Sequence, residues 1–288
     1  MKKPTSWAPP GQEAPLSSDN EYELVFARIE AVCERAAEKV LHELEAAGSL
    51  CDELIAAPMR TWSELVRESR FLTISVANRL LLSAARERTT NPSKAAALAA
   101  VTFDLCNRLP GDSAAAGLVA EVRLGALCQL AAARLDLGDR VAAHEALRCA
   151  ARHLGGSVFD CERAHYALTL GRLRAMQGRI DEALALLDRA ATLFAVLGQQ
   201  EEQGAALTEK GCLLLDAAET QAAELELKRA MQLLGRSTSS RAHLLLQKAS
   251  HGVIVCRAEL RGPELAAELL RRWANKPGSR PNGRPPKK

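Results

Sequence analysis

Apolar residues recur every three or four positions along most of this 288-residue chain, which is the spacing of amphipathic helices. The pattern predicts a helix over 21–47, which Gly48 ends, and a short helix after it. It predicts further helices over 61–88 and 92–109, the second with Asn91 as its N-cap and a proline at its first position. The chain is therefore expected to be all-α.

Three later segments, 130–150, 170–190 and 210–230, repeat one another at a spacing of 40 residues. Each holds two helical stretches separated by a turn, with small residues and a leucine at the same places. The matching positions are Ala143, Ala183 and Ala223, then Leu147, Leu187 and Leu227, then Ala150, Ala190 and Ala230. Helical hairpins repeated at a fixed period stack side by side, so the sequence predicts a solenoid.

At these residues the chain resembles the tetratricopeptide repeat (TPR) family in a long-period form found in bacterial regulatory proteins. The best unit matches the family motif at Leu170-Gly171, Ala183, Leu187 and Ala190. It departs from the motif where the family has Trp, Tyr and Pro, at Ala167, Arg174 and Ala195. The resemblance implies a right-handed TPR-like solenoid of about five helical hairpins, acting as a non-catalytic scaffold for protein–protein interaction.

The pattern divides the chain into four parts. Residues 1–20 are predicted to be a disordered tail, 21–60 an N-terminal helical cap, and 61–274 the TPR-like repeat domain. The last hairpin is expected to turn at Arg261-Gly262-Pro263. Residues 275–288 carry five basic residues and no acid among Pro and Gly, and are predicted to be a second disordered tail.

Composition supports the helical prediction and limits the function. Alanine supplies 52 residues and leucine 45, whereas valine and isoleucine together supply 18 and aromatic residues only 3%. This excludes a β-rich fold and argues against a base-stacking nucleic-acid platform. The eight scattered cysteines and the absence of a signal or membrane-spanning segment favour a reduced, cytoplasmic protein. The Ala- and Arg-rich usage favours a bacterial source.

No familiar catalytic or nucleotide-binding motif is present, so we expect no enzyme activity and no cofactor. One constellation has metal-ligand spacing: Cys149 and His153, then Cys161 and His165, each pair one helical turn apart. The repeat register places Cys149 on a second helix and His165 on a first helix. Packing cysteines and surface histidines are therefore the favoured interpretation, and no metal is expected.

The family's concave groove gives the candidate partner-binding residues. In the resemblance, first helices line this groove, which can receive a peptide or a helix. The predicted groove residues are His165, Leu168, Arg172 and Met176 from one unit, with Cys128, Asp136, Thr208 and Asp216 from its neighbours. This surface is predicted to be mostly small and apolar, with few charges. The alternative is that these positions only face solvent or the next helix.

The basic tail supports a second hypothesis. Five cations in 275–288 can touch phosphates weakly, so the chain is alternatively a nucleic-acid-associated or signalling regulator whose TPR array recruits a transcription or signalling partner. Nucleic-acid contact beyond the tail and membrane contact are not expected.

Overall fold

The computed structural model describes residues 18–109, 116–154 and 160–262, and the regular structure in these ranges is entirely helical. This confirms the predicted all-α fold. Short 3₁₀ turns, Met59–Thr61 and Ser69–Phe71, flank α2. The α-helices are α1 (Ser18–Ala56), α2 (Trp62–Leu65), α3 (Ile74–Glu87), α4 (Pro92–Arg108), α5 (Ala116–Asp136), α6 (Arg140–Leu154), α7 (Asp160–Met176), α8 (Ile180–Val196), α9 (Gln200–Asp216), α10 (Thr220–Leu234) and α11 (Ser240–Arg261).

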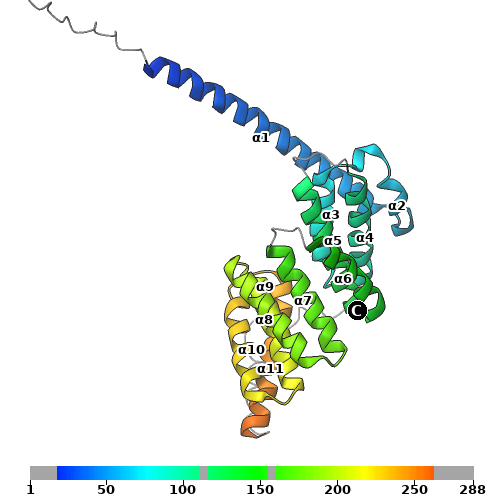
Figure 1. Cartoon of the computed structure of the whole chain (residues 1–288), viewed down its shortest axis with the longest axis vertical. Helices are drawn as coiled ribbons and strands as arrows, with labels where there is room; N and C mark the ends of the chain where they lie inside the picture. Colours follow the sequence, from blue (N-terminus) through cyan, green and yellow to red (C-terminus); the bar gives the residue numbers. More distant parts are fainter. Residues whose placement is uncertain (1–17, 110–115, 155–159, 263–288) are drawn as a thin grey trace, which may run out of the picture.

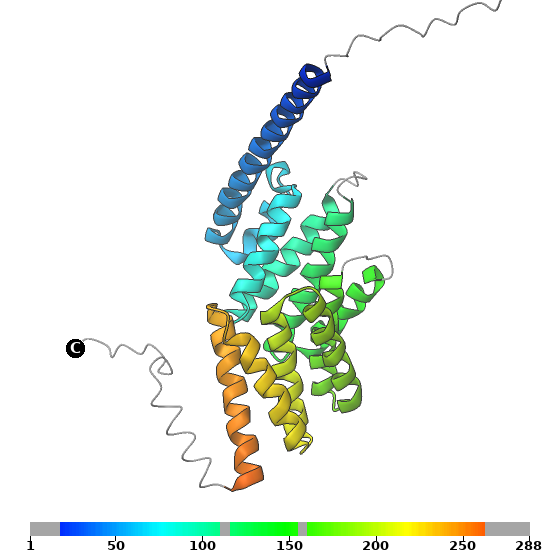
Figure 2. The ribbon, with the colours of Figure 1, turned by 90° about the vertical axis from the view of Figure 1, so that its left-hand side faces the viewer.

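The helices from α3 onward form stacked antiparallel pairs (Figures 1 and 2). The pairs are α3–α4, α5–α6, α7–α8 and α9–α10, followed by α11. The first helices α3, α5, α7, α9 and α11 also contact one another in order. The array is thus the predicted solenoid, with four hairpins and the first helix of a fifth in the described ranges. The predicted partner helix of α11, near 263–273, lies outside the described residues, as do the tail 275–288 and most of 1–20.

The repeated small residues hold the paired helices together. Ala183, Leu187 and Ala190 are all fully or almost fully buried, as the register predicts. Gly171 of α7 approaches the same leucine so closely that a Cβ on it would lie 3.1 Å from Leu187 Cγ. The Gly of the motif therefore has a packing function, because a Cβ at this position would press against the Leu187 side chain.

Three of the four hairpins, α5–α6, α7–α8 and α9–α10, turn through one residue in the left-handed backbone region. Gly138 and Gly178 occupy it with φ of 78° and 75°, and Ala218 occupies the equivalent place with φ of 61°. Ala218 is the one non-glycine residue of the described ranges with positive φ. An alanine in this conformation is strained by its Cβ.

Replacing Ala218 by glycine is expected to stabilise the protein by about 0.5–1 kcal/mol, because glycine adopts this conformation without steric cost. The reverse change, Gly178→Ala, is expected to destabilise it by a similar amount. Chemical unfolding of both variants measures the two effects. Equal stability of Ala218→Gly and Gly178→Ala would contradict the strain at this turn.

Two predicted helix boundaries are wrong. Gly48 does not end the first helix, because α1 runs on to Ala56. Packing outweighs the roughly 1 kcal/mol propensity cost of one glycine, since Ala47, Cys51 and Leu54 on either side of it are all buried.

The predicted helix over 61–88 is also broken. Its first half is two 3₁₀ turns around α2, which bury the aromatic side chains of Trp62 and Phe71. The helix proper, α3, starts after Thr73, whose side chain accepts a hydrogen bond from the Val76 N–H at 3.2 Å. The predicted start of α4 is confirmed: Asn91 caps it through the Lys94 N–H at 3.0 Å.

Helix α5 is both long and apolar. Among the described helices it alone has the length and composition of a membrane span, with half of that stretch buried. It packs against α3, α4, α6 and α7. These contacts account for its apolar composition as that of a core helix.

Candidate partner-binding groove

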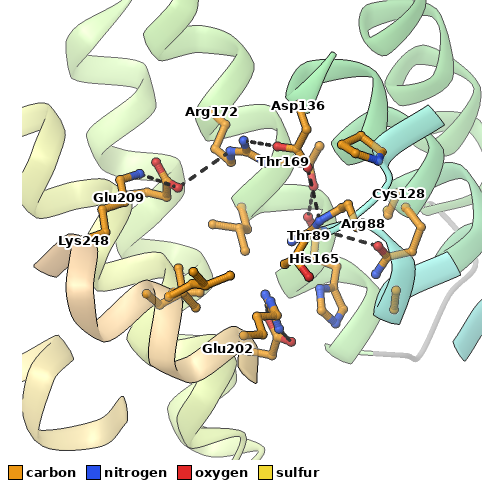
Figure 3. A pocket seen from close by; sticks show the side chains of 18 residues that line it. Arg88, Thr89, Cys128, Asp136, His165, Thr169, Arg172, Glu202, Glu209 and Lys248 are labelled. Carbon is orange, nitrogen blue, oxygen red and sulfur yellow. Dashed lines mark hydrogen bonds and ion pairs between the residues drawn. The ribbon is translucent and has the colours of Figure 1, made fainter. Parts of the chain in front are cut away.

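A pocket of about 340 Å³ lies on the face formed by the first helices (Figure 3). Side chains from α3, α5, α7, α9 and α11 or their ends all line it, and no second helix contributes apart from Pro92 at the start of α4. The pocket is therefore the concave groove of the array.

An alternating row of charges crosses this groove, with one residue from each successive first helix or its C-terminal end. The Arg88 Nε lies 3.4 Å from Asp136 Oδ2, and the Asp136 Oδ1 accepts a hydrogen bond from Arg172 Nη2 at 2.6 Å. The Arg172 Nε lies 3.9 Å from Glu209 Oε1, which also accepts a hydrogen bond from Lys248 Nζ at 2.9 Å. We call these five residues the charge row. Figure 3 shows them in order across the pocket.

A second row lies seven residues earlier on four of these helices, at Gln129, His165, Glu202 and Arg241. Seven residues are almost two helical turns, so both rows share a face. Arg241 Nη2 donates to Glu202 Oε2 at 2.8 Å, and Nη1 donates to Oε1 to complete a bidentate pair. Arg88 Nη1 donates to Gln129 Oε1 at 3.3 Å and so connects the two rows.

Burial and neighbouring charges shift the pKa values in the groove. Burial favours the neutral form of Glu202, but the hydrogen bonds and charge of Arg241 outweigh it and hold the Glu202 pKa at about 2. Burial lowers the pKa of Arg88 to about 10, with Arg241 nearby adding to the effect. Burial also lowers the pKa of His165. A neutral imidazole is thus favoured at neutral pH.

The groove carries more cations than carboxylates. Its lining holds Arg88, Arg172, Arg241 and Lys248 against Asp136, Glu202 and Glu209, a formal charge of 4 − 3 = +1. Asp136 is shared by two arginines, and Glu209 by an arginine and a lysine. The guanidinium and ammonium groups of the row therefore keep donors for an incoming anionic group.

Five of the eight predicted groove residues line the pocket: Cys128, Asp136, His165, Leu168 and Arg172. The other three are placed elsewhere. Met176 packs with the core around Leu147, and Thr208 is fully buried with its hydroxyl donating to the Gly204 carbonyl at 2.7 Å. Asp216 is exposed at the end of α9 and does not line the pocket.

The prediction of a groove with few charges is also wrong. Five charged residues of the lining were not anticipated: Arg88, Glu202, Glu209, Arg241 and Lys248. The sequence does contain a pattern that could have found them. Pairs of polar residues seven apart, and so on one helix face, occur at 129 and 136, 165 and 172, 202 and 209, and 241 and 248.

The four residues with metal-ligand spacing do not converge. The Cys161 thiol pairs with the side chain of Gln199, and the His165 ring lies edge-on to Phe194 with ring centroids 5.0 Å apart. His153 is exposed, and Cys149 packs beside the buried Ala150. No three His, Cys, Asp or Glu residues of the described ranges are placed to hold a metal ion.

Comparison with solved structures finds TPR-like repeat proteins. A putative kinesin light chain of Podosopora anserina with nearly identical TPR-like repeats aligns over 69% of this chain and 94% of its own, with 18% identity and a TM-score of 0.48; a point variant of that protein aligns similarly. BtubC (BKLC) of P. vanneervenii aligns over 75% of this chain and 95% of its own, with 15% identity and a TM-score of 0.47. The described residues of this chain likewise form stacked helical hairpins. No protein-family model and no curated protein matches the chain.

Proposed function

We propose that this TPR-like array is a non-catalytic scaffold of the bacterial cytoplasm, and that its groove binds an acidic segment of a partner protein. The observation that carries the proposal is the excess of cations over carboxylates in a concave pocket lined by five first helices. In a solenoid these helices form one continuous surface, which suits an extended or helical segment.

The chemistry of the groove defines the partner segment. Arg88 and Lys248 are the two ends of the charge row, and each has a carboxylate on one side only. A carboxylate of the partner can pair with either end, and an arginine fork can bind it in bidentate fashion. Leu244 and Leu245 line the same pocket, and the side chain of Leu244 is 53% exposed. They offer apolar contact, so we propose a segment that combines Asp or Glu with an apolar residue.

Selection from a displayed library of random 12-residue peptides tests this function with defined probes. We expect selected peptides to be enriched in Asp and Glu, and Arg172→Ala to weaken the best of them about fivefold to tenfold, or about 1 kcal/mol. Lys248→Ala, at the exposed end of the row, is expected to act in the same direction. Isothermal titration calorimetry measures both changes.

The matched control is Arg189→Ala, which removes an exposed arginine from the second helix α8. It is expected to leave peptide affinity unchanged, and circular dichroism checks that all variants keep their helicity. Peptides that lose affinity with Arg189→Ala but not with Arg172→Ala would place binding on the convex face. A failure to select acidic peptides would contradict the proposed partner.

The alternative of a nucleic-acid-associated regulator stays a prediction. It depends on the basic residues of 275–288, which lie outside the described residues, and no contact in the described ranges favours it.

A further inference from the structure

Helix α1 extends well beyond the body of the array (Figures 1 and 2). Its 39 residues correspond to a length of about 58 Å. Its last turns pack on the body through the buried residues Ala47, Cys51 and Leu54, in contact with α3. In the preceding stretch, every residue from 28 to 46 whose side chain is described is exposed.

The exposed part of α1 carries an apolar stripe. Ile29, Val32 and Leu44 are 52%, 58% and 52% exposed. At 100° per residue they lie on the same side of the helix as Ala47 and Leu54. The face that docks on the body therefore continues beyond it without a covering element in the described ranges. Long helices owe most of their stability in water to the packing of such a face, and monomeric proteins seldom expose one of this size.

The charges around the stripe indicate what covers it. Residues 18–46 hold eight acidic and three basic residues, a net charge of 3 − 8 = −5, which opposes binding to an anionic lipid surface. Glu34, Glu38 and Glu45 lie on the side of the helix opposite the stripe, whereas Glu43 lies on the side of the stripe; all four are exposed. When two such helices pair through their stripes, the first three carboxylates face outward and Glu43 lies at the contact. Physiological salt screens repulsion between exposed charges beyond about 8 Å.

We propose that α1 pairs with α1 of a second copy of this chain through the stripe that includes Ile29, Val32 and Leu44, giving a dimer. Residues 18–46 span four heptads, or about 43 Å, which is long enough for a two-helix coiled coil. The stripe is self-complementary, as the closed two-fold interface of a homodimer requires. Because α1 projects from the array, the pairing leaves the groove free.

Sedimentation equilibrium of the full chain tests the proposal. We expect a species of twice the 31.0 kDa monomer mass at micromolar concentration. The double variant Ile29→Glu, Val32→Glu places two carboxylates of each helix, four in the dimer, at the contact and is expected to raise the dimer dissociation constant at least about a hundredfold. Neither side chain is buried in the body, so the melting temperature of the array is expected to stay within a few degrees.

The matched control changes charge on the opposite side of the helix. Glu34→Lys with Glu38→Lys is expected to leave the dimer intact. A chain that stays monomeric at 100 µM would overturn the proposal, as would a dimer that survives Ile29→Glu, Val32→Glu. Loss of the dimer on Lys248→Glu, with the stripe variant still dimeric, would place the contact in the groove instead. A chain that is monomeric in solution and binds phosphatidylcholine vesicles through the stripe would identify lipid as the occupant.

Discussion

Replacing Ala183 with phenylalanine is expected to destabilise the array by about 3 kcal/mol or more and to lower its melting temperature by on the order of 10 °C. Ala183 is completely buried between α7 and α8, beside Leu187. The Ala183 carbonyl oxygen lies 3.4 Å from the place where a Cβ on Gly171 would be, so the two helix backbones are already close. An aromatic ring has no space there unless the helices separate.

Ala185→Phe is the matched control, because the same change is made two residues away on α8 at an exposed position. It is expected to change stability by less than about 0.5 kcal/mol. Thermal unfolding followed by circular dichroism measures both variants. If Ala183→Phe had the same melting temperature as the wild type, the close contact between α7 and α8 described above would be wrong.

Replacing Arg241 with alanine is expected to cost about 3 kcal/mol at pH 7 and to change how stability depends on pH. The Arg241 and Glu202 side chains are only 22% and 20% exposed, so the change leaves a carboxylate without its partner in a mostly buried position. In the wild type the pKa of Glu202 is about 2 in the folded state against an ordinary value of 4.5. The folded state therefore binds this proton less readily than the unfolded state does.

The direction of the pH effect follows from this difference. The stabilisation is fully present above about pH 4.5 and is lost as the pH falls toward 2, by about 3 kcal/mol in total. Without Arg241 the cause of the low Glu202 pKa is gone. The variant is therefore expected to lose much less stability than the wild type between pH 4.5 and pH 2. Urea unfolding between pH 2.5 and 7 measures the difference.

Lys228→Ala is the control for this pair, because its ammonium group also pairs with a glutamate but is 46% exposed. Its stability is expected to stay close to that of the wild type at every pH. An Arg241→Ala variant with the wild-type acid transition would show that the pair does not set the pKa of Glu202.

The repeat domain could be predicted from the sequence because its packing depends on small residues at fixed positions. Ala183, Leu187 and Ala190 mark the contact between paired helices, and each is buried as expected. The N-cap at Asn91 was equally readable, since it depends only on adjacent residues. The end of α1 was not, because Gly48 is a local signal that long-range burial of Cys51 and Leu54 overrides.

The residues of the groove could be predicted only in part, because the groove depends on contacts between helices of different repeats. Asp136, Arg172, Glu209 and Lys248 lie 36, 37 and 39 residues apart, not 40. The residues that touch on neighbouring first helices are therefore not the residues at the same position of the repeat. They differ from it by up to four residues, or about one helical turn. A fixed 40-residue register makes Cys212 the equivalent of Arg172, and so it misses Glu209. It selects Thr208 as the equivalent of Leu168, and that hydroxyl is buried.

The charge row also connects the number of repeats to the sign of the groove. Its members alternate from Arg88 to Lys248 and number five, one for each first helix or its end. Because the charges alternate and there are five of them, both ends of the row carry the same sign. The row therefore has three cations and two carboxylates, an excess of one positive charge. Loss of one terminal hairpin, or gain of one that continues the alternation, would make the series even and the row neutral. In this array the parity of the repeat count thus decides whether the row attracts an anion.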